Sequence, residues 1–169
     1  LSGYWKGGGP GESDPHVGTA FALLFLSKGR RPVLLAKLKH GPGEDWNRHR
    51  SDAANLTRYV ESKWRRDLTW QVIDPRAAGP EDLLQAPVLF ISGRDGLDFT
   101  PRQKENLRTY ANQGGFIFAE ACCGGERFDR RFRQLMKELF PDSPLRLLPP
   151  QHPVWYHNLK ANPNVEIRD

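Results

Sequence analysis

The fold is decided by Gly114-Gly-Phe-Ile-Phe-Ala-Glu-Ala-Cys-Cys-Gly-Gly-Glu126, an apolar run set between two glycine pairs. A charged amphipathic segment, residues 127–140, follows directly. This order predicts a strand over residues 116–121, a tight turn that carries Cys122 and Cys123, and a helix that begins near Glu126. The turn is the part of the chain in which we expect chemistry.

Cys122 and Cys123 are the only cysteines of the chain. A thiol at the start of a helix faces the positive end of the helix dipole, which favours the thiolate and hence nucleophilic attack or metal binding. A cysteine can equally be a small buried apolar residue. A zinc site built from both cysteines and His152 is not expected, because adjacent cysteines rarely both bind one zinc ion. No cofactor is expected either.

The composition restricts the class of protein. The chain has 169 residues, enough for one medium domain, and its mean hydropathy of −0.65 is typical of a soluble protein. The apolar run at residues 20–26 is far too short to span a membrane, so no membrane partner is expected. The net charge is +5, but acidic residues interleave with the basic ones, as in residues 126–133. Nucleic acid is therefore not expected as a partner.

Strand-like and helix-like segments alternate along the chain. Strands are expected at residues 33–39, 69–74, 88–92, 116–121 and 145–148, and helices at residues 17–28, 53–66, 100–112 and 127–140. Continuously apolar strands that alternate with helices indicate a parallel sheet covered on both faces. We predict a doubly wound, flavodoxin-like α/β fold with strand order 2-1-3-4-5.

Unusual polar residues follow the predicted strands, at the carboxyl edge where such sheets bind ligands. The candidate ligand-binding residues are Trp46, Asn47, Arg48, His49 and Arg50 after the first strand, Ser92, Arg94 and Asp95 after the third, and Gly124 and Gly125 after the fourth. Arginine forks and a tryptophan face suit an anion or a sugar. In the alternative interpretation Trp46 packs on the core and the arginines are solvated.

Two further residues have candidate catalytic roles beside the cysteines. His152 can be the base that activates a thiol, or can simply hydrogen-bond a loop. Glu120 lies one residue inside the end of the fourth strand, where it can pair with an arginine or act as an acid–base group if it is buried.

Three segments together resemble a bacterial family known as domain of unknown function 4159: residues 46–59, 114–125 and 148–155. The resemblance extends from about Arg31 to Trp155. Residues 14–29 resemble the last helix of an α/α toroid similar to squalene cyclases and prenyltransferases. The resemblance implies that residues 1–29 are the remnant of an upstream helical domain, itself a partner in the full-length protein. Residues 30–169 would be the α/β domain, shortened at its carboxyl end.

The family is similar to the class I glutamine amidotransferase-like superfamily, which implies a three-layer sandwich with a nucleophile elbow, Gly-x-Cys-x-Gly, after a central strand. Two frames fit in part. Ala121-Cys-Cys-Gly-Gly125 makes Cys123 the nucleophile, and Glu120-Ala-Cys-Cys-Gly124 makes it Cys122. Neither frame is a full match, and no His-Glu pair follows at amidotransferase spacing.

Two functions remain open from the sequence. The first is a binding or accessory module that recognises a small polar or anionic ligand, such as a carbohydrate, at the carboxyl edge of the sheet. The alternative is a cysteine-dependent hydrolase or transferase that uses the Cys122/Cys123 elbow. Thiol reactivity discriminates the two, because a catalytic cysteine alkylates rapidly near neutral pH.

Overall fold

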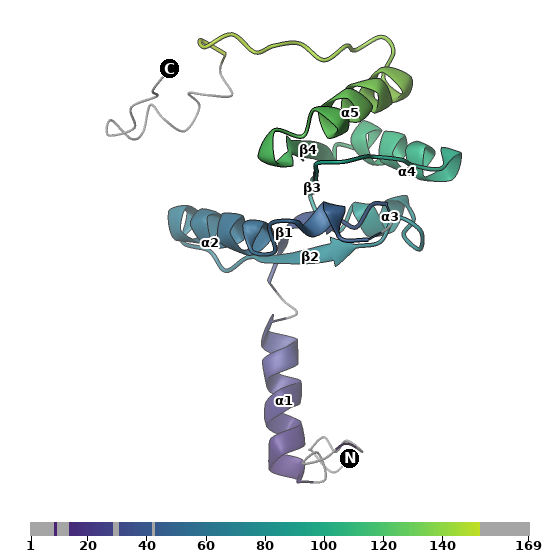
Figure 1. Ribbon diagram of the computed structural model, residues 1–169. Coiled ribbons are helices and arrows are strands. Elements are labelled where there is room, and N and C mark those ends of the chain that lie inside the picture. The colour runs from purple at the N-terminus through teal and green to yellow at the C-terminus, as the bar shows by residue number, and fades with distance from the viewer. Residues whose placement is uncertain (1–8, 10–13, 29–30, 42, 153–169) are drawn as a thin grey trace.

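The computed structural model describes residues 9, 14–28, 31–41 and 43–152 of the chain. In this part, the sheet has four strands: β1 (Val33–Leu38), β2 (Thr69–Ile73), β3 (Val88–Gly93) and β4 (Phe116–Ala121). All neighbouring strands pair in parallel, in the order β2-β1-β3-β4 (Figure 1). The predicted parallel sheet and the order of its first four strands are therefore confirmed.

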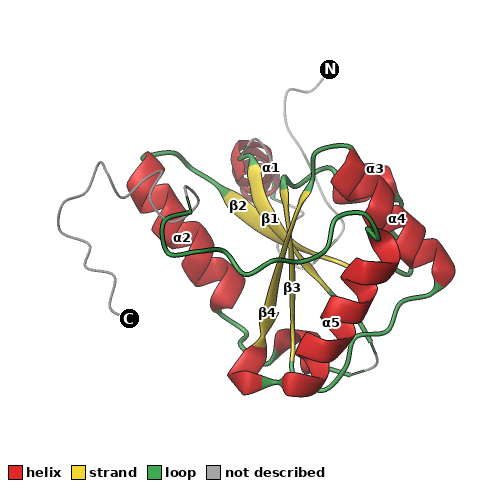
Figure 2. Ribbon diagram, turned by 90° about the horizontal axis from the view of Figure 1, so that it is seen from above, coloured by secondary structure: helices red, strands yellow, loops and turns green. Residues whose placement is uncertain are grey.

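Helices alternate with the strands, as the sequence predicts. They are α2 (Asp52–Trp64), α3 (Pro80–Leu83), α4 (Pro101–Asn112) and α5 (Glu126–Leu139). Helix α2 lies on one side of the sheet, and α3, α4 and α5 lie on the other (Figure 2). Thr100 caps α4: its hydroxyl accepts from the amide of Gln103, whose side chain accepts from the amide of Thr100.

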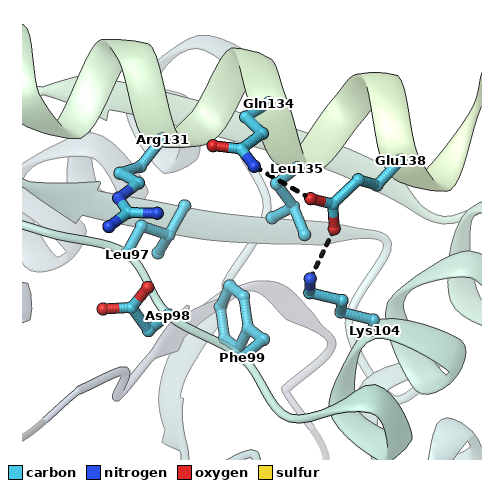
Figure 3. Close-up of a pocket in the computed structure, with 8 residues that line it drawn as sticks. All are labelled: Leu97, Asp98, Phe99, Lys104, Arg131, Gln134, Leu135 and Glu138. Atoms are coloured by element: carbon cyan, nitrogen blue, oxygen red, sulfur yellow. Dashed lines mark hydrogen bonds and ion pairs between the residues drawn. The ribbon is translucent and has the colours of Figure 1, made fainter.

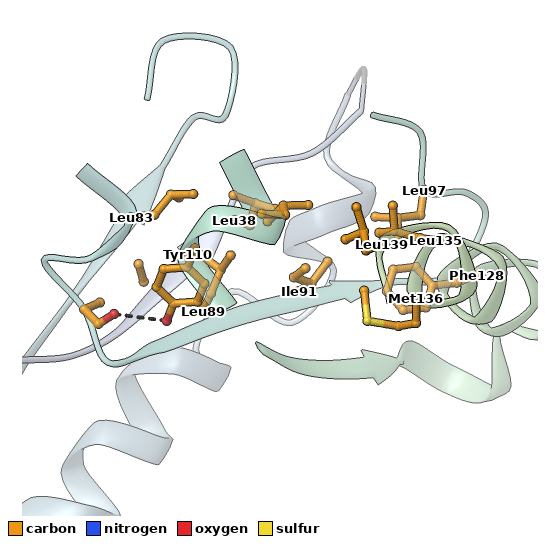
Figure 4. Close-up of a cluster of buried hydrophobic side chains, with 13 residues drawn as sticks. Leu38, Leu83, Leu89, Ile91, Leu97, Tyr110, Phe128, Leu135, Met136 and Leu139 are labelled. Atoms are coloured by element: carbon orange, nitrogen blue, oxygen red, sulfur yellow. Dashed lines mark hydrogen bonds between the residues drawn. The ribbon is translucent and has the colours of Figure 1, made fainter. Parts of the chain in front are cut away.

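The larger core lies between the sheet and helices α3, α4 and α5 (Figure 4). Tyr110 is fully buried there, and its hydroxyl donates a 3.0 Å hydrogen bond to the carbonyl of Ala86. Its ring lies against Gly115, where an added Cβ would come within 2.3 Å of a ring atom. The second glycine before β4 is thus required because only a residue without a side chain leaves room for the ring.

The smaller core lies under α2 and is built around Leu35, Ala53 and Phe90. Phe118 of β4 stacks on Phe90, with ring centroids 5.4 Å apart. Helix α2 packs on β1 and β2, and no described helix covers β4 on this side. Phe116 and Phe118 consequently remain exposed, and so does Glu120 in the same alternating row.

The predicted fifth strand at residues 145–148 is wrong, because the structure has no strand between α5 and His152. Leu147 is 98% exposed, and Leu145 and Leu148 are exposed too. Prolines at positions 144, 149 and 150 flank the segment and lack the amide hydrogen that a strand ladder needs. The apolar composition of residues 145–148 led to the prediction of a strand that does not form.

Helix α1 (Pro15–Lys28) confirms the predicted amino-terminal helix. It stands apart from the sheet in Figure 1, and its apolar side chains are largely exposed, Phe21 by 65% and Phe25 by 77%. Across the described residues, no helix combines the length and the apolar character that crossing a membrane requires.

Candidate functional site

The cysteine turn is a single 3-10 turn, η2 (Cys122–Gly124), between the end of β4 and the start of α5. Cys123 adopts a left-handed conformation, with φ 54° and ψ 34°. Cys122 is buried and Cys123 is exposed. The turn therefore presents one thiol to solvent, and that thiol belongs to the strained residue.

Gly125 closes the turn against the loop after β3. An added Cβ at Gly125 would lie 2.7 Å from both the Cα and the carbonyl oxygen of Arg94. The same carbonyl accepts a 3.2 Å hydrogen bond from the amide of Phe128 in the first turn of α5. The backbones of Gly125 and Arg94 are thus in direct contact, and the cysteine turn and the loop after β3 fix each other's position.

The loop after β1 is fixed by a buried lysine. Lys37 points from β1 toward this loop, and its ammonium group donates to Asn47 Oδ1 and the His49 carbonyl, both at 3.0 Å. It also pairs with both carboxylate oxygens of Asp52 at 2.7 Å. Lys37 is 1% exposed, so these acceptors compensate the burial of its charge. The ammonium group thereby sets the path of the backbone at His49.

Asp45 joins the loop after β1 to the loop after β3. It lies in the 3-10 turn η1 (Asp45–Asn47), and its carboxylate accepts from the backbone amides of Arg94 and Asp95 at 3.1 and 3.0 Å. Burial alone would raise the pKa of Asp45, but the hydrogen bonds from Arg48 and from these two amides outweigh it and hold the pKa below its ordinary value. Asp45 therefore stays ionised and anchors both loops.

These constraints bring His49 to the cysteines. The Sγ of Cys123 lies 3.5 Å from Nε2 of His49, and the Sγ atoms of Cys122 and Cys123 lie 3.1 Å apart. The three ligand-type atoms are all within 4.8 Å of one another. A thiol in contact with an imidazole is the arrangement in which the ring can accept the thiol proton.

The two thiols have different surroundings. Burial raises the pKa of Cys122 to about 11, helped by its contact with Cys123 and by the negative charges of Cys123 and Glu120. The positive charge of Arg48 acts in the opposite direction on Cys122. Cys122 is thus a protonated, inaccessible thiol at neutral pH, and thiolate chemistry falls to Cys123.

An open groove lies beside the thiol–imidazole pair. It has a volume of about 500 Å³, and it is lined by Arg48, His49, Arg50, Ser51, Asp52 and Asn55. Two guanidinium groups, a hydroxyl, an amide and the Asp52 carboxylate, which pairs with Lys37, line it along with the imidazole. The groove therefore offers several hydrogen-bond donors around His49, whose ring contacts Cys123.

Two other hollows are separate from this arrangement. One, of about 90 Å³, lies between α4, α5 and the loop at residues 97–99, and its Lys104 pairs with Glu138, as Figure 3 shows. Another, of about 350 Å³, lies at the end of β2 around Asp74 and Asp82. Neither is lined by a histidine, whereas the groove of about 500 Å³ is lined by His49, the residue whose ring contacts Cys123.

The family model of domain of unknown function 4159, DUF4159, matches residues 34–168. The chain belongs to the DUF4159 family. The match begins in β1 and includes every loop of the site, whereas α1 lies outside it. No curated protein matches the sequence, so the comparison brings no established activity to this DUF4159 domain.

Several of the residues predicted to bind a ligand are engaged within the DUF4159 domain itself. Trp46 is buried with its ring 5.7 Å from the Lys37 ammonium group, and Asn47 accepts from that same group. Arg48 donates to Asp45 at 2.5 Å and pairs with Asp95. Its hydrogen bond to Asp45 raises its pKa. The groove is consequently left with Arg50 and the outer face of Arg48 as its cationic groups.

The remaining predicted residues lie at the ends of β3 and β4. Ser92 is buried, and its hydroxyl donates a 3.4 Å hydrogen bond to Glu120. Arg94 is exposed, and its backbone rather than its side chain makes the contacts that hold the elbow. Gly124 has a φ of +70°, and together with Cys123 it makes the left-handed part of the turn.

The imidazole in contact with the thiol is His49, whereas the sequence predicted His152 as the base. The structure shows His152 with its amide donating to the carbonyl of Pro149 at 2.9 Å. His40 is a third imidazole at this edge: it is buried, and its Nε2 donates a 2.7 Å hydrogen bond to the carbonyl of Ser92. Burial lowers the pKa of His40, against opposing effects of that hydrogen bond and of Asp45.

Lys37 and Asp45 are site-forming residues that the sequence analysis did not single out, whereas His40 was expected at this edge because it follows the first strand. Lys37 had a usable signal, since a lysine within an apolar strand must find buried acceptors. Asp45 gave no such signal, because an acid in a polar loop is ordinary.

Proposed function

We propose that this DUF4159 domain is a cysteine-dependent hydrolase or transferase, with Cys123 as the nucleophile and His49 as its base. The observation that carries the proposal is the 3.5 Å contact between Cys123 Sγ and His49 Nε2, made by an exposed residue in a left-handed elbow. Nucleophile and base within contact distance, on a sharp strand-to-helix turn, are the parts that thiol catalysis needs.

The proposed reaction is acyl transfer. His49 Nε2 takes the proton of the Cys123 thiol, and the thiolate attacks a carbonyl carbon to form a new C–S bond. The bond to the leaving group breaks, and the imidazolium returns its proton to that group. Water, or a second acceptor, then attacks the thioester and releases Cys123. Helix α5 begins at Glu126, three residues after Cys123, and the unpaired amides of a helix's first turn are donors of the kind that stabilise developing negative charge.

The side chains that line the groove support the proposal that the substrate is a small polar or anionic molecule. Arg48 and Arg50 line it together with His49, and guanidinium groups bind carboxylates and phosphates in two-point geometry. A binding module without catalysis is the other hypothesis from the sequence. It is supported less well, because Trp46, Asn47 and Asp95 are already engaged in internal contacts.

We further propose that the domain is related to the class I glutamine amidotransferase-like superfamily and shares its flavodoxin-like sheet. The parallel order β2-β1-β3-β4 and the turn after β4 support it. A toroid partner upstream of residue 30 remains part of the same proposal, supported by the exposed apolar side chains of α1.

A model acyl donor tests the catalytic proposal. The purified chain is mixed with p-nitrophenyl acetate at pH 7.5, and we expect a burst of nitrophenolate together with an acetyl group on Cys123 in the mass spectrum. Cys123→Ala should abolish the burst, and His49→Gln should reduce its rate by at least about a hundredfold. His152→Gln and His16→Gln are matched controls that remove imidazoles outside the pair. Equal acylation of wild type and His49→Gln would favour the binding module instead.

A further inference from the structure

The cluster of His49, Cys122 and Cys123 has a second chemical capacity that thiol catalysis does not use. It brings two sulfur atoms and one imidazole nitrogen together from two separate loops. Soft thiolate and borderline imidazole donors are the set that Zn²⁺ and related thiophilic cations select. Acyl transfer needs only one of the two sulfurs, so the role of Cys122 is open.

The distances can be compared with those of a tetrahedral zinc site. A Zn–S bond of about 2.3 Å and a Zn–N bond of about 2.05 Å at a tetrahedral angle separate sulfur and nitrogen by about 3.6 Å. Cys123 and His49 already stand 3.5 Å apart. Two such Zn–S bonds separate their sulfurs by about 3.8 Å. The sulfurs of Cys122 and Cys123, which lie 3.1 Å apart, would therefore have to move about 0.7 Å further from each other, and side-chain rotation can achieve this.

The surroundings allow a cation to enter. Cys123 and His49 are exposed and form the outer side of the cluster, and Cys122 closes its inner side. Lys37 and Asn47 fix the backbone of the His49 loop, and Gly125 fixes the turn that carries both sulfurs. A donor set held by rigid loops loses little conformational freedom on binding, which favours affinity.

We propose that Cys122, Cys123 and His49 form a binding site for one Zn²⁺-like cation, with three protein ligands and an open fourth position. Adjacent cysteines rarely both bind one zinc ion, but in this turn, where Cys123 is left-handed, the two sulfurs lie only 3.1 Å apart. Both thiols lose their protons to solvent when the cation binds. The ion then occupies the thiolate of Cys123 and the lone pair of His49, so acyl transfer at Cys123 stops while it is bound. The site shares two residues with the proposed function but does not depend on their being catalytic.

Binding can be measured without any enzyme assay. The reduced, chelator-treated chain, with both thiols confirmed by titration, is titrated with Cd²⁺ while the thiolate-to-cadmium charge-transfer absorbance is followed. We expect saturation at one equivalent and displacement of Cd²⁺ by excess Zn²⁺. Cys122→Ser and His49→Gln should each weaken binding by at least about tenfold. His16→Gln, which removes an imidazole on α1, should bind as the wild type does.

A second measurement protects the test against variants that fail to fold. In the wild-type chain, Zn²⁺ should slow alkylation of Cys123 by iodoacetamide at least about tenfold, and a chelator should restore it. Absence of saturable binding, or binding that survives in Cys122→Ser and His49→Gln alike, overturns the cation site. Acetylation of Cys123 without cation binding would remove this inference alone, and cation binding without acetylation would remove the proposed function alone.

Discussion

The Sγ of Cys123 lies 3.5 Å from Nε2 of His49, although 74 positions of the chain separate the two residues. Neither side chain reaches the other by local structure. One sits on the turn after β4 and the other on the loop after β1, and the parallel sheet brings the ends of both strands to one edge. The contact therefore depends on the whole sheet.

Alkylation should discriminate between the two cysteines. With iodoacetamide at pH 7.5, Cys123 should be labelled first, because it is exposed and beside an imidazole. Cys122 should remain unlabelled in the folded chain, since it is buried and its pKa is raised to about 11. Peptide mass spectrometry over time measures both rates. If Cys122 were labelled as fast as Cys123, the difference in exposure and pKa between the two thiols would be contradicted.

The left-handed backbone at Cys123 should be detectable as strain. A residue with a Cβ costs about 1–2 kcal/mol in that conformation, whereas glycine does not. Cys123→Gly should therefore be at least as stable as Cys123→Ala, even though glycine adds about 0.4–1 kcal/mol of entropy to the unfolded chain. Urea denaturation of both variants gives the difference. An alanine variant that is clearly the more stable would argue against a strained elbow.

The Lys37–Asp52 pair should be essential to stability and to the position of His49. Lys37→Met leaves the carboxylate of Asp52 without its partner, and we expect a loss of about 3 kcal/mol in the free energy of unfolding. The double variant Lys37→Met/Asp52→Asn should lose less, because no charge is then left uncompensated. Alkylation of Cys123 should slow in both, since the His49 carbonyl loses its donor. A double variant that loses as much stability as the two single variants together would rule out a coupling between Lys37 and Asp52.

His40 should make the domain sensitive to acid. Its pKa in the folded chain lies below the ordinary value because of burial, so the unfolded chain binds a proton at a higher pH than the folded one. The free energy of unfolding should hold steady above about pH 6.5 and decline as the pH falls from there toward the folded pKa of His40. His40→Gln, which keeps a donor for the Ser92 carbonyl, should show a flatter dependence. Equal slopes for both proteins would exclude His40 as the cause.

Helix α1 should be dispensable for the α/β domain. Its apolar side chains are largely exposed, so removing the helix by deletion of residues 1–29 should cost the domain little buried surface from α1. The melting temperature should change by less than about 2–4 °C, the shift that 1 kcal/mol causes in a domain of this size. Calorimetry of the shortened chain measures it. A larger drop would make the helix an integral part of the fold.

The sheet and its edge could be predicted because they follow from repeating physical patterns. Apolar strands that alternate with helices specify a parallel sheet, and the carboxyl ends of its strands place the loop of His49 beside the turn of Cys123. The two glycine pairs indicated the turns before and after β4. These inferences needed only spacing and chain direction.

Which imidazole contacts the thiol of Cys123 could not be predicted in the same way. His49 and His152 both follow expected strands, and sequence spacing does not say which ring approaches the thiol. The answer depends on Lys37, whose buried ammonium group holds the carbonyl of His49. The error at residues 145–148 has a similar origin, because only the packed structure reveals that Leu147 has nothing to cover it.

The strands that precede His49 and Cys123, β1 and β4, lie on either side of β3, and this arrangement has a consequence for the newly made protein. A chain still emerging from the ribosome, or one whose strands have paired in the wrong order, carries an ordinary thiol. The enhanced reactivity that we propose for Cys123 requires the contact with His49, and this contact requires β1, β3 and β4 to be paired in one sheet. We therefore expect the labelling of Cys123 by a slow electrophile inside cells to report how many molecules are correctly folded.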